Sequence, residues 1–244
     1  MKILGIDIYE NNKDVLLEHF KKLDNGYICV TSVHGLIESY ENKKISLAFK
    51  NSFANVPDGM PIVYFGKIIK KINLNRITGP EFIFDFLKSI NKSNSSLITI
   101  GGSDESINLF KELISNRFNK INYITADTSY IDINNSDDLT RIRKFVLENQ
   151  AEYCLIFLPT PTQDLLMYKI KQFSNIKMIG FGAALDYSVG KIHYAPKILQ
   201  KMSLEWLFRL LQDPKRLFGR YVKIIPKFFF YLLLSLFQKK NKDT

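Results

Sequence analysis

Cysteine and histidine are scarce in this 244-residue sequence. Its two cysteines, Cys29 and Cys154, each lie inside a short apolar run, where a reduced cysteine is expected as a small core residue. We therefore expect no structural disulfide, which favours a reducing compartment. The three histidines are scattered: we assign His19 to a helix face and His34 to the start of a loop, both in structural roles, and His193 has no neighbouring ligand. With no acidic cluster at ligand spacing, no metal or other cofactor is predicted.

Long apolar runs are also missing. The most apolar stretch, residues 228–237, is far shorter than the roughly 20 residues needed to span a bilayer. The apolar N-terminus is broken by Asp7 and Glu10 before a signal-peptide core can form, so a cytoplasmic protein is expected. The sequence has no Gly-x-Ser-x-Gly elbow and no P-loop lysine, which argues against a serine hydrolase and against ATP binding by a Walker motif.

Positive charge is plentiful. The chain has 34 Lys and Arg against 24 Asp and Glu, a formal charge of +10. Such a surface attracts polyanions: nucleic acid, anionic lipid head groups or phosphorylated substrates. No nucleic-acid-binding motif accompanies the charge, so nucleic acid ranks last among these partners.

Short β-rich runs alternate with segments of helical period, which predicts an α/β fold with a mostly parallel sheet. The expected strands are 28–31, 62–65, 97–100, 122–125, 153–158 and 177–181. The expected helices are 14–22, 80–89, 105–118, 136–150 and 162–173. We interpret the polar segment 91–96 as a linker between two sub-lobes. Beyond residue 195 the chain becomes helical, basic and aromatic, which divides it into a core (1–195) and an appendage (196–244).

Two motifs present charged side chains before predicted elements. Asp58 lies in a Pro-Asp-Gly turn before the expected strand 62–65, where it either carries chemistry or simply supports the turn. Arg76 and Thr78 precede a helix that starts near Pro80. A guanidinium beside free helix-start amides suits a phosphate, although a solvated arginine before an ordinary cap fits equally well.

Three further motifs follow predicted strands. Gly101 and Gly102 end one strand, Gln163 and Asp164 follow another, and the small residues 180–184 follow a third. The carboxyl ends of parallel strands are where α/β proteins bind ligands. We therefore expect these residues to surround one crevice.

The C-terminal segment combines charge with apolar side chains. Arg216, Arg220, Lys223 and Lys227 recur at helical intervals and can form one positive stripe, although we expect Pro226 to interrupt or bend the helix. Residues 228–237 are interpreted as a segment that lies in the interface of an anionic membrane. The alternative is that this run packs on the protein's own core or in an oligomer interface.

In order and spacing, these segments resemble the WecG/TagA/CpsF family of bacterial glycosyltransferases over residues 3–222. The resemblance rests on Ile3-Leu-Gly-Ile-Asp, Val30-Thr31, Pro57-Asp-Gly, Asn75-Arg-Ile-Thr-Gly, Gly101-Gly, Pro161-Thr-Gln-Asp, Gly180-Phe-Gly-Ala-Ala-Leu-Asp, Ala195-Pro, Leu204-Glu-Trp-Leu-Phe-Arg-Leu-Leu-Gln-Asp-Pro-Lys-Arg-Leu and Arg220-Tyr. The block from Leu204 is the most specific.

The resemblance implies a Rossmann-like glycosyltransferase fold with a helical, membrane-associating C-terminal appendage. It implies an inverting, metal-independent transfer from a UDP-sugar, often N-acetylmannosamine or its uronic acid, to an undecaprenyl-diphosphate-linked acceptor. The products are teichoic acid or other cell-surface polysaccharides, made at the inner face of the plasma membrane, and small homo-oligomers are expected. The alternative is a non-catalytic scaffold that binds nucleotide sugar or anionic lipid.

The resemblance also assigns roles to residues. Asp58 becomes the general base and Arg76 a phosphate ligand, while Thr31 and Gln163 position donor or acceptor. Arginines of the appendage would fold over the site and stabilise departing UDP. The remaining binding residues are Thr78, Gly101, Gly102, Asp164, Arg209, Arg216 and Arg220.

The sequence departs from the family pattern in three places. Val33 stands where Asn is common, Thr162 where Lys is common, and residues 126–130 replace a His-Gly-Tyr-Phe-like stretch. These departures concern the identity of the donor sugar.

Overall fold

The computed structural model describes residues 1–240, except the side chains of residues 201, 216 and 236–240. The strands are β1 (Lys2–Ile3), β2 (Ile6–Asp7), β3 (Gly26–Thr31), β4 (Ala54–Pro57), β5 (Ser96–Gly101), β6 (Asn122–Asp127), β7 (Tyr153–Phe157) and β8 (Lys177–Gly180). The helices are α1 (Lys13–Lys21), α2 (Val33–Glu41), α3 (Lys43–Lys50), α4 (Met60–Ile69), α5 (Gly79–Ile90), α6 (Asp104–Arg117), α7 (Ser136–Asn149), α8 (Thr162–Ile170), α9 (Ala184–Ser188), α10 (Lys197–Lys201), α11 (Glu205–Gln212) and α12 (Pro214–Lys240).

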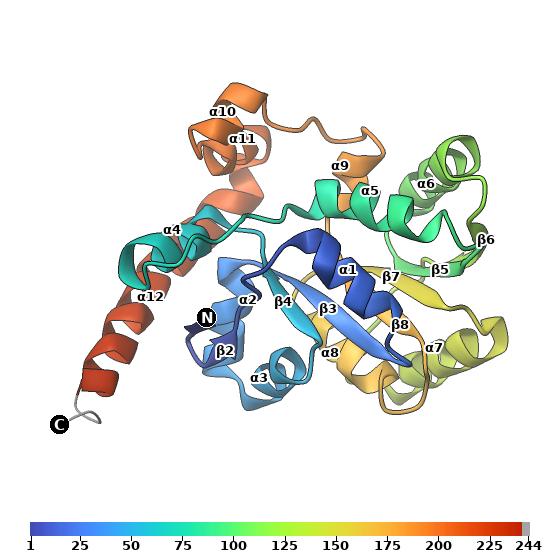
Figure 1. Cartoon of the computed structure of the whole chain (residues 1–244), viewed down its shortest axis with the longest axis horizontal. Helices are drawn as coiled ribbons and strands as arrows, with labels where there is room; N and C mark the ends of the chain where they lie inside the picture. Colours follow the sequence, from blue (N-terminus) through green and yellow to red (C-terminus); the bar gives the residue numbers. More distant parts are fainter. Residues whose placement is uncertain (241–244) are drawn as a thin grey trace.

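Six strands form one parallel sheet in the order β4-β3-β8-β7-β5-β6, and β1 and β2 form a separate antiparallel hairpin (Figure 1). The predicted α/β fold with a mostly parallel sheet is therefore confirmed, and it is Rossmann-like. All six carboxyl ends lie along one edge, as expected for strands joined by helical crossovers. That edge brings together segments far apart in the sequence.

Helices cover both faces of the sheet. One apolar cluster holds residues of α1, α5, α6 and α9, and the other holds residues of α2, α3, α7 and α8. Neighbouring strand residues alternate between the clusters, as Leu155 and Ile156 of β7 show. Because both faces are covered, β7 is a continuous apolar run that is buried throughout.

The predicted strand 62–65 is wrong, because these residues belong to helix α4. Ile62 and Phe65 are both buried, and their spacing of three is helical rather than alternating. The strand of this region is β4, which ends immediately before Asp58. The Pro-Asp-Gly turn therefore follows a strand instead of preceding one, and Pro61 occupies the first turn of α4, where its missing amide is tolerated.

Three other expectations need correction. His34 lies in the first turn of α2 and not in a loop. The expected linker 91–96 only joins α5 to β5, which pairs with β6 and β7 in the continuous sheet, so no second sub-lobe begins there. Helix α12 continues through Pro226 without interruption, since packing of the helix on α2 offsets the lost backbone hydrogen bond.

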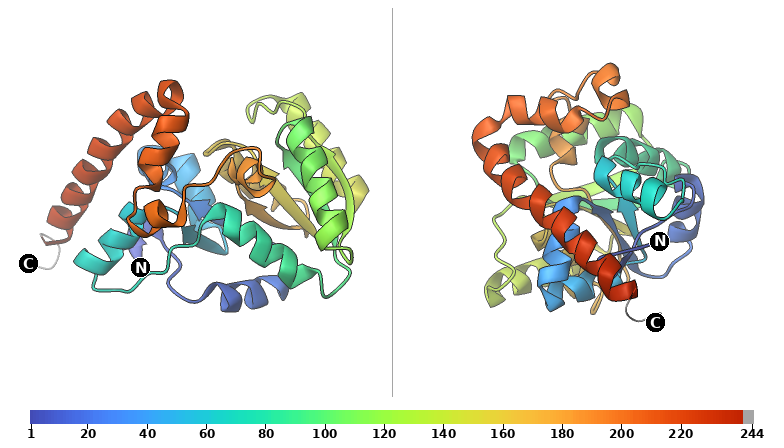
Figure 2. Two further views of the ribbon diagram at one scale, coloured as in Figure 1. Left: turned by 90° about the horizontal axis from the view of Figure 1, so that it is seen from above. Right: turned by 90° about the vertical axis from the view of Figure 1, so that its left-hand side faces the viewer.

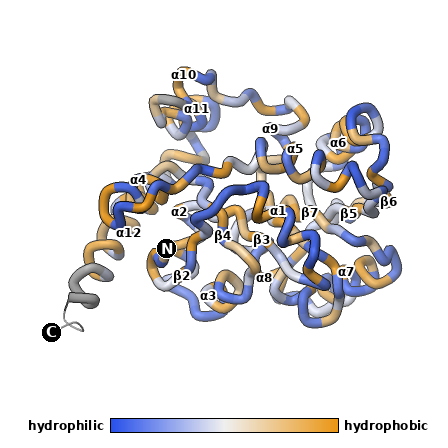
Figure 3. Tube along the Cα trace, in the orientation of Figure 1, coloured by the Kyte–Doolittle hydropathy of each residue, from blue (hydrophilic) through white to orange (hydrophobic). Residues whose placement is uncertain are grey.

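Helix α12 extends along one side of the molecule, where it packs against α2 (Figure 2). Phe228 and Leu232 are buried and join the core cluster that contains α2 and α3, whereas Phe229, Phe230 and Leu233 are more than half exposed. The apolar run therefore packs on the protein along one face and leaves another uncovered, and apolar residues extend along α4 and α12 beyond the sheet (Figure 3). Within residues 1–240, no helix has the length and apolar character to cross a bilayer.

Candidate active site

A cavity of about 330 Å³ lies beside the carboxyl ends of β3 and β4, where α11 and α12 approach the sheet. The loop after β3, the turn after β4, the strand-like segment before α5 and the C-terminal helices all contribute to its wall. The charged residues that line it are Asp58, Arg76, Glu205, Arg209 and Arg220, and His34 lines it as well. The sequence motifs around Asp58, Arg76 and Leu204 thus meet at one place.

Asp58 presents a carboxylate to this cavity. Its side chain is 23% exposed, and Oδ1 has no hydrogen-bond partner among the described residues. The backbone amide of Gly79, at the start of α5, donates to the carboxylate. Burial raises the pKa of Asp58 above its ordinary value, opposed by the charges of Arg209 and Arg76. A carboxylate with a free oxygen and a raised pKa is suited to accept a proton.

Arg76 is held on both sides. Its Nε donates to the backbone oxygen of Asp58 at 2.5 Å, and its Nη2 lies 3.9 Å from Asp58 Oδ1. Its Nη1 lies 2.8 Å from Oε2 of Glu205. The guanidinium is therefore fixed between the turn that carries the carboxylate and the first residue of α11.

Glu205 connects two arginines. Its other oxygen, Oε1, lies 2.6 Å from Nη2 of Arg209, one helical turn along α11, and the carboxylate is nearly buried. Arg209 also stacks its guanidinium 4.8 Å above the centre of the Tyr187 ring. Because each guanidinium still has N–H groups that Glu205 does not occupy, the pair can bind an anion in the cavity.

The outer wall of the cavity is aromatic and apolar. Trp206 and Tyr221 pack edge to face with ring centres 6.1 Å apart, and Phe228 and Phe229 of α12 line the same space. Arg220 of α12 lines it as well. The side chain of Arg216, predicted to act with Arg220, lies outside the described part of the chain.

Gln163 and Asp164 lie elsewhere, in the first turn of α8. Gln163 Oε1 accepts a hydrogen bond of 2.9 Å from the Gly182 amide, which ties the loop after β7 to the loop after β8. Asp164 is 1% exposed and faces the Cys29 thiol. Burial raises the pKa of Asp164 to about 7. Neither residue lines the cavity.

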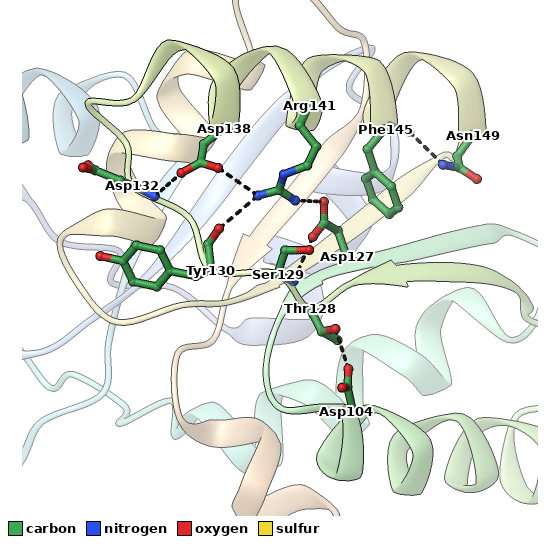
Figure 4. A network of polar contacts seen from close by, with 10 residues as sticks. All are labelled: Asp104, Asp127, Thr128, Ser129, Tyr130, Asp132, Asp138, Arg141, Phe145 and Asn149. Carbon is green, nitrogen blue, oxygen red and sulfur yellow. Dashed lines mark hydrogen bonds and ion pairs between the residues drawn. The ribbon is translucent and has the colours of Figure 1, made fainter.

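Gly101 ends β5 and Gly102 follows it, farther along the edge. Both have positive φ, and an added Cβ would meet Leu158 at 2.7 Å in one case and Leu185 at 2.7 Å in the other, so both positions require glycine. Beyond them, the loop after β6 is tied down by Asp127 and Arg141, and Thr128 donates to Asp104 (Figure 4). The polar groups of this part of the edge bind one another.

The two predicted threonines are engaged within the fold. Thr31 is buried and donates to the backbone oxygen of Cys29 at 3.1 Å, and its own backbone oxygen accepts from the Asp58 amide. Thr78 donates to Glu81 at 2.9 Å where α5 begins. Neither threonine lines the cavity itself, but each is close in sequence to a residue that does: Thr31 directly precedes Ser32, and Thr78 lies two residues after Arg76.

Sequence reasoning missed several cavity residues. Glu205 lies inside the most specific motif block, but nothing in its type showed that it pairs with Arg76 from a distant segment. Tyr187 directly follows the Gly180–Asp186 motif, and its role as a platform for Arg209 depends on tertiary structure. His34 was assigned to a loop, and its position on α2 places it in the cavity wall. In the described residues, no group of three or more His, Cys, Asp or Glu side chains is arranged to hold a metal ion.

Comparison with known proteins agrees with the motifs. The model of the glycosyl transferase WecG/TagA/CpsF family matches residues 1–242. The chain is 26% identical, over 93% of its length and 90% of theirs, to N-acetylglucosaminyldiphosphoundecaprenol N-acetyl-beta-D-mannosaminyltransferases of Staphylococcus aureus strains MW2 and COL. Because the family model covers nearly the whole chain, including every cavity residue, this protein belongs to the WecG/TagA/CpsF family of glycosyl transferases.

Proposed function

We propose that the protein is an inverting glycosyltransferase that moves a sugar from a UDP-sugar to a polyprenyl-diphosphate-linked acceptor in cell-surface polysaccharide or teichoic acid synthesis. The observation that carries this proposal is Oδ1 of Asp58, which accepts no hydrogen bond from the described residues, in a cavity lined by Arg76, Arg209 and Arg220. The cavity thus offers a proton acceptor beside cationic groups. The activity for which the Staphylococcus aureus relatives are named, transfer of N-acetylmannosamine to an undecaprenol-linked acceptor, supports the acceptor class and makes N-acetylmannosamine the first donor sugar to test.

Asp58 acts as the general base. The acceptor hydroxyl oxygen attacks the anomeric carbon as its proton passes to Asp58, and the bond from that carbon to the UDP oxygen breaks. A single displacement of this kind inverts the anomeric configuration. The raised pKa of Asp58 makes the ionised carboxylate a stronger proton acceptor.

The arginines stabilise the leaving UDP. Negative charge grows on the diphosphate oxygen as the glycosidic bond breaks, and guanidinium groups fixed in a cavity stabilise it without reorganising. Glu205 fixes Arg76 and Arg209 in position before the substrate arrives. In this proposal the arginines perform the charge stabilisation and no metal ion is required; the family resemblance assigns the same role to Arg216.

The remaining predicted residues hold the loops around the substrates. Gln163 fixes the loops after β7 and β8 to each other, and Gly101, Gly102 and Asp164 shape the neighbouring strand ends. Thr31 and Thr78 position the segments that carry the Asp58 turn and Arg76.

The C-terminal region, residues 196–244, brings the site to the acceptor at the inner face of the plasma membrane. The exposed apolar side chains of α12 include Phe218, Val222, Phe229 and Leu233, and Lys223 and Lys227 lie on a neighbouring face. An amphipathic helix with flanking basic residues binds the surface of anionic membranes. Because α12 also lines the cavity, membrane binding and catalysis share one helix.

The proposal is tested by measuring UDP release from a panel of UDP-sugars with a lipid-diphosphate-linked N-acetylglucosamine acceptor, with and without chelator. Acceptor-dependent release that persists in chelator, with an inverted anomeric configuration in the product, supports it. A folded protein that binds UDP-sugar but releases no UDP with any donor is instead a non-catalytic scaffold, and this result overturns the proposal.

A further inference from the structure

His34 is a cavity residue to which the proposed reaction gives no role. It lies in the first turn of α2, two residues after the N-cap residue Ser32, and lines the same cavity as Asp58 and Arg220. Its Nε2 lies 3.2 Å from Oε1 of Glu38, one turn farther along α2. The ring is therefore fixed at one nitrogen by its own helix.

The other ring nitrogen is unsatisfied. Nδ1 of His34 is buried and has no hydrogen-bond partner among the described residues. A buried polar atom without a partner destabilises the fold, so a native structure that keeps one generally uses it. The residue that carries this nitrogen lines the cavity in which the proposed function places the substrates.

The charges around His34 define its protonation state. Glu38 faces it from α2, Arg220 from α12, and Asp58 shares the cavity. Burial and then the charge of Arg220 lower the pKa of His34, and Glu38 opposes them only in part, so the ring is neutral at pH 7. Glu38 accepts a hydrogen bond only from a protonated Nε2. Nδ1 consequently carries a lone pair and acts as an acceptor.

An acceptor of this kind discriminates between substrate groups. A phosphate diester or diphosphate at neutral pH offers oxygens that repel a lone pair, whereas a sugar hydroxyl or the N–H of an acylamino sugar donates to it. Resting on the proposed function, we propose that His34 is a sugar-binding residue: Nδ1 accepts a hydrogen bond from a hydroxyl or acylamino N–H of a substrate sugar, and Glu38 fixes the tautomer that permits it.

This assignment divides the cavity by chemistry. Arg76, Arg209 and Arg220 offer only donors and take the diphosphate oxygens. His34, on the α2 side, offers an acceptor and takes a donor group of the sugar. The cavity therefore recognises both halves of a sugar nucleotide, or the sugar and diphosphate of the lipid acceptor, through groups of opposite hydrogen-bonding type.

The test compares two substitutions of one residue. His34→Leu removes the acceptor, whereas His34→Asn can place its acceptor oxygen Oδ1 at the position of Nδ1. We expect His34→Leu to raise the KM of one sugar substrate about tenfold, His34→Asn to stay within about threefold of wild type, and the Kd of UDP alone to stay unchanged in both. The proposal is overturned if His34→Leu has the wild-type Tm and its KM values for the sugar donor and for the sugar acceptor both equal those of wild type.

A measurement without turnover separates this inference from the proposed reaction. Titrations of UDP and of UDP-N-acetylmannosamine and UDP-N-acetylglucosamine, with ¹⁵N spectra of the histidine ring, need no acceptor. An unprotonated Nδ1 in wild type, and a sugar contribution to binding that His34→Leu loses, support the inference even if no transfer occurs. A protonated Nδ1 at pH 7 overturns it even if transfer is active.

A third variant, Glu38→Gln, tests whether Glu38 fixes the tautomer of His34. Gln can donate to Nε2 and so allow the proton to move to Nδ1, which turns the acceptor into a donor. We expect this variant to shift the ¹⁵N signal of Nδ1 and to raise the same KM as His34→Leu. An unchanged ¹⁵N spectrum and unchanged KM would contradict the role given to Glu38.

Discussion

The two halves of the sheet's carboxyl edge contain similar motifs but treat their polar groups differently. At β3 and β4, the Asp58 carboxylate lines a cavity, and its Oδ1 accepts no hydrogen bond from the described residues. At β7 and β8, Gln163 Oε1 accepts a hydrogen bond from the Gly182 amide, and the Asp164 carboxylate is buried beside Cys29, away from the cavity. A strand-end motif therefore lies at the edge of an α/β sheet where ligands bind, but only the position of its side chain relative to a cavity separates a ligand site from an internal brace.

The largest effect is expected at Asp58. Asp58→Asn keeps the shape and removes the base, so kcat should fall by about 10³ or more, while UDP binding and Tm remain near wild type. In wild type, kcat should rise with pH through a pKa above the ordinary value for Asp, because burial raises it. Measuring kcat of wild type and of Asp58→Asn across a range of pH tests the loss of kcat in the variant and the pH dependence of the wild type. Retained activity in Asp58→Asn would place the base elsewhere.

The next effect concerns the arginines. Arg209→Gln removes a positive charge but can still form hydrogen bonds, and we expect kcat to fall about 10²-fold through lost stabilisation of the leaving diphosphate. Lys171 is the matched control, because it is a cation that lies outside the cavity. Lys171→Gln should leave kcat unchanged, and equal losses in the two variants would contradict a specific role for Arg209.

Asp164 tests the sealed half of the comparison. Its folded pKa of about 7 exceeds the ordinary value, so the folded state holds a proton that the unfolded state releases. The resulting stability is present at low pH and is lost as pH rises through about 7. Asp164→Asn avoids this loss, so its Tm advantage over wild type should grow by about 5 °C between pH 5 and pH 8. A difference that is constant with pH would show that Asp164 is not buried as described.

The smallest effect is expected at Gln163. Gln163→Leu removes the hydrogen bond to the Gly182 amide, which should lower stability by about 1 kcal/mol and Tm by a few degrees. Thermal melts together with kcat decide the role: a large loss of kcat at unchanged Tm would move Gln163 from the braced half of the edge to the substrate-binding half.

The sequence predicted the parallel sheet because its strands are buried on both faces and appear as continuous apolar runs, as β7 does. It failed at residues 62–65 because a short apolar run fits a strand or a helix equally well, and β4 contains Asn55 and Pro57 and lacks the pattern of an isolated strand. Motif resemblance singled out Asp58, Arg76 and Arg209, which line one cavity in the structure. It missed Glu205 and His34, whose roles arise only when α11 and α2 meet residues from distant segments.

Helix α12 has a mechanical consequence. It is one uninterrupted helix of 27 residues, about 40 Å long, and Glu41 of α2 grips it near the middle through Lys227 and Tyr231. When a straight helix that is fixed near its middle tilts, its two ends move in opposite directions. A tilt of about 3° around that grip moves the cavity end, near Leu217, by about 1 Å, a displacement large enough to misalign reacting groups. A force on the exposed apolar end of α12 would thereby change the position of Arg220 relative to the rest of the cavity.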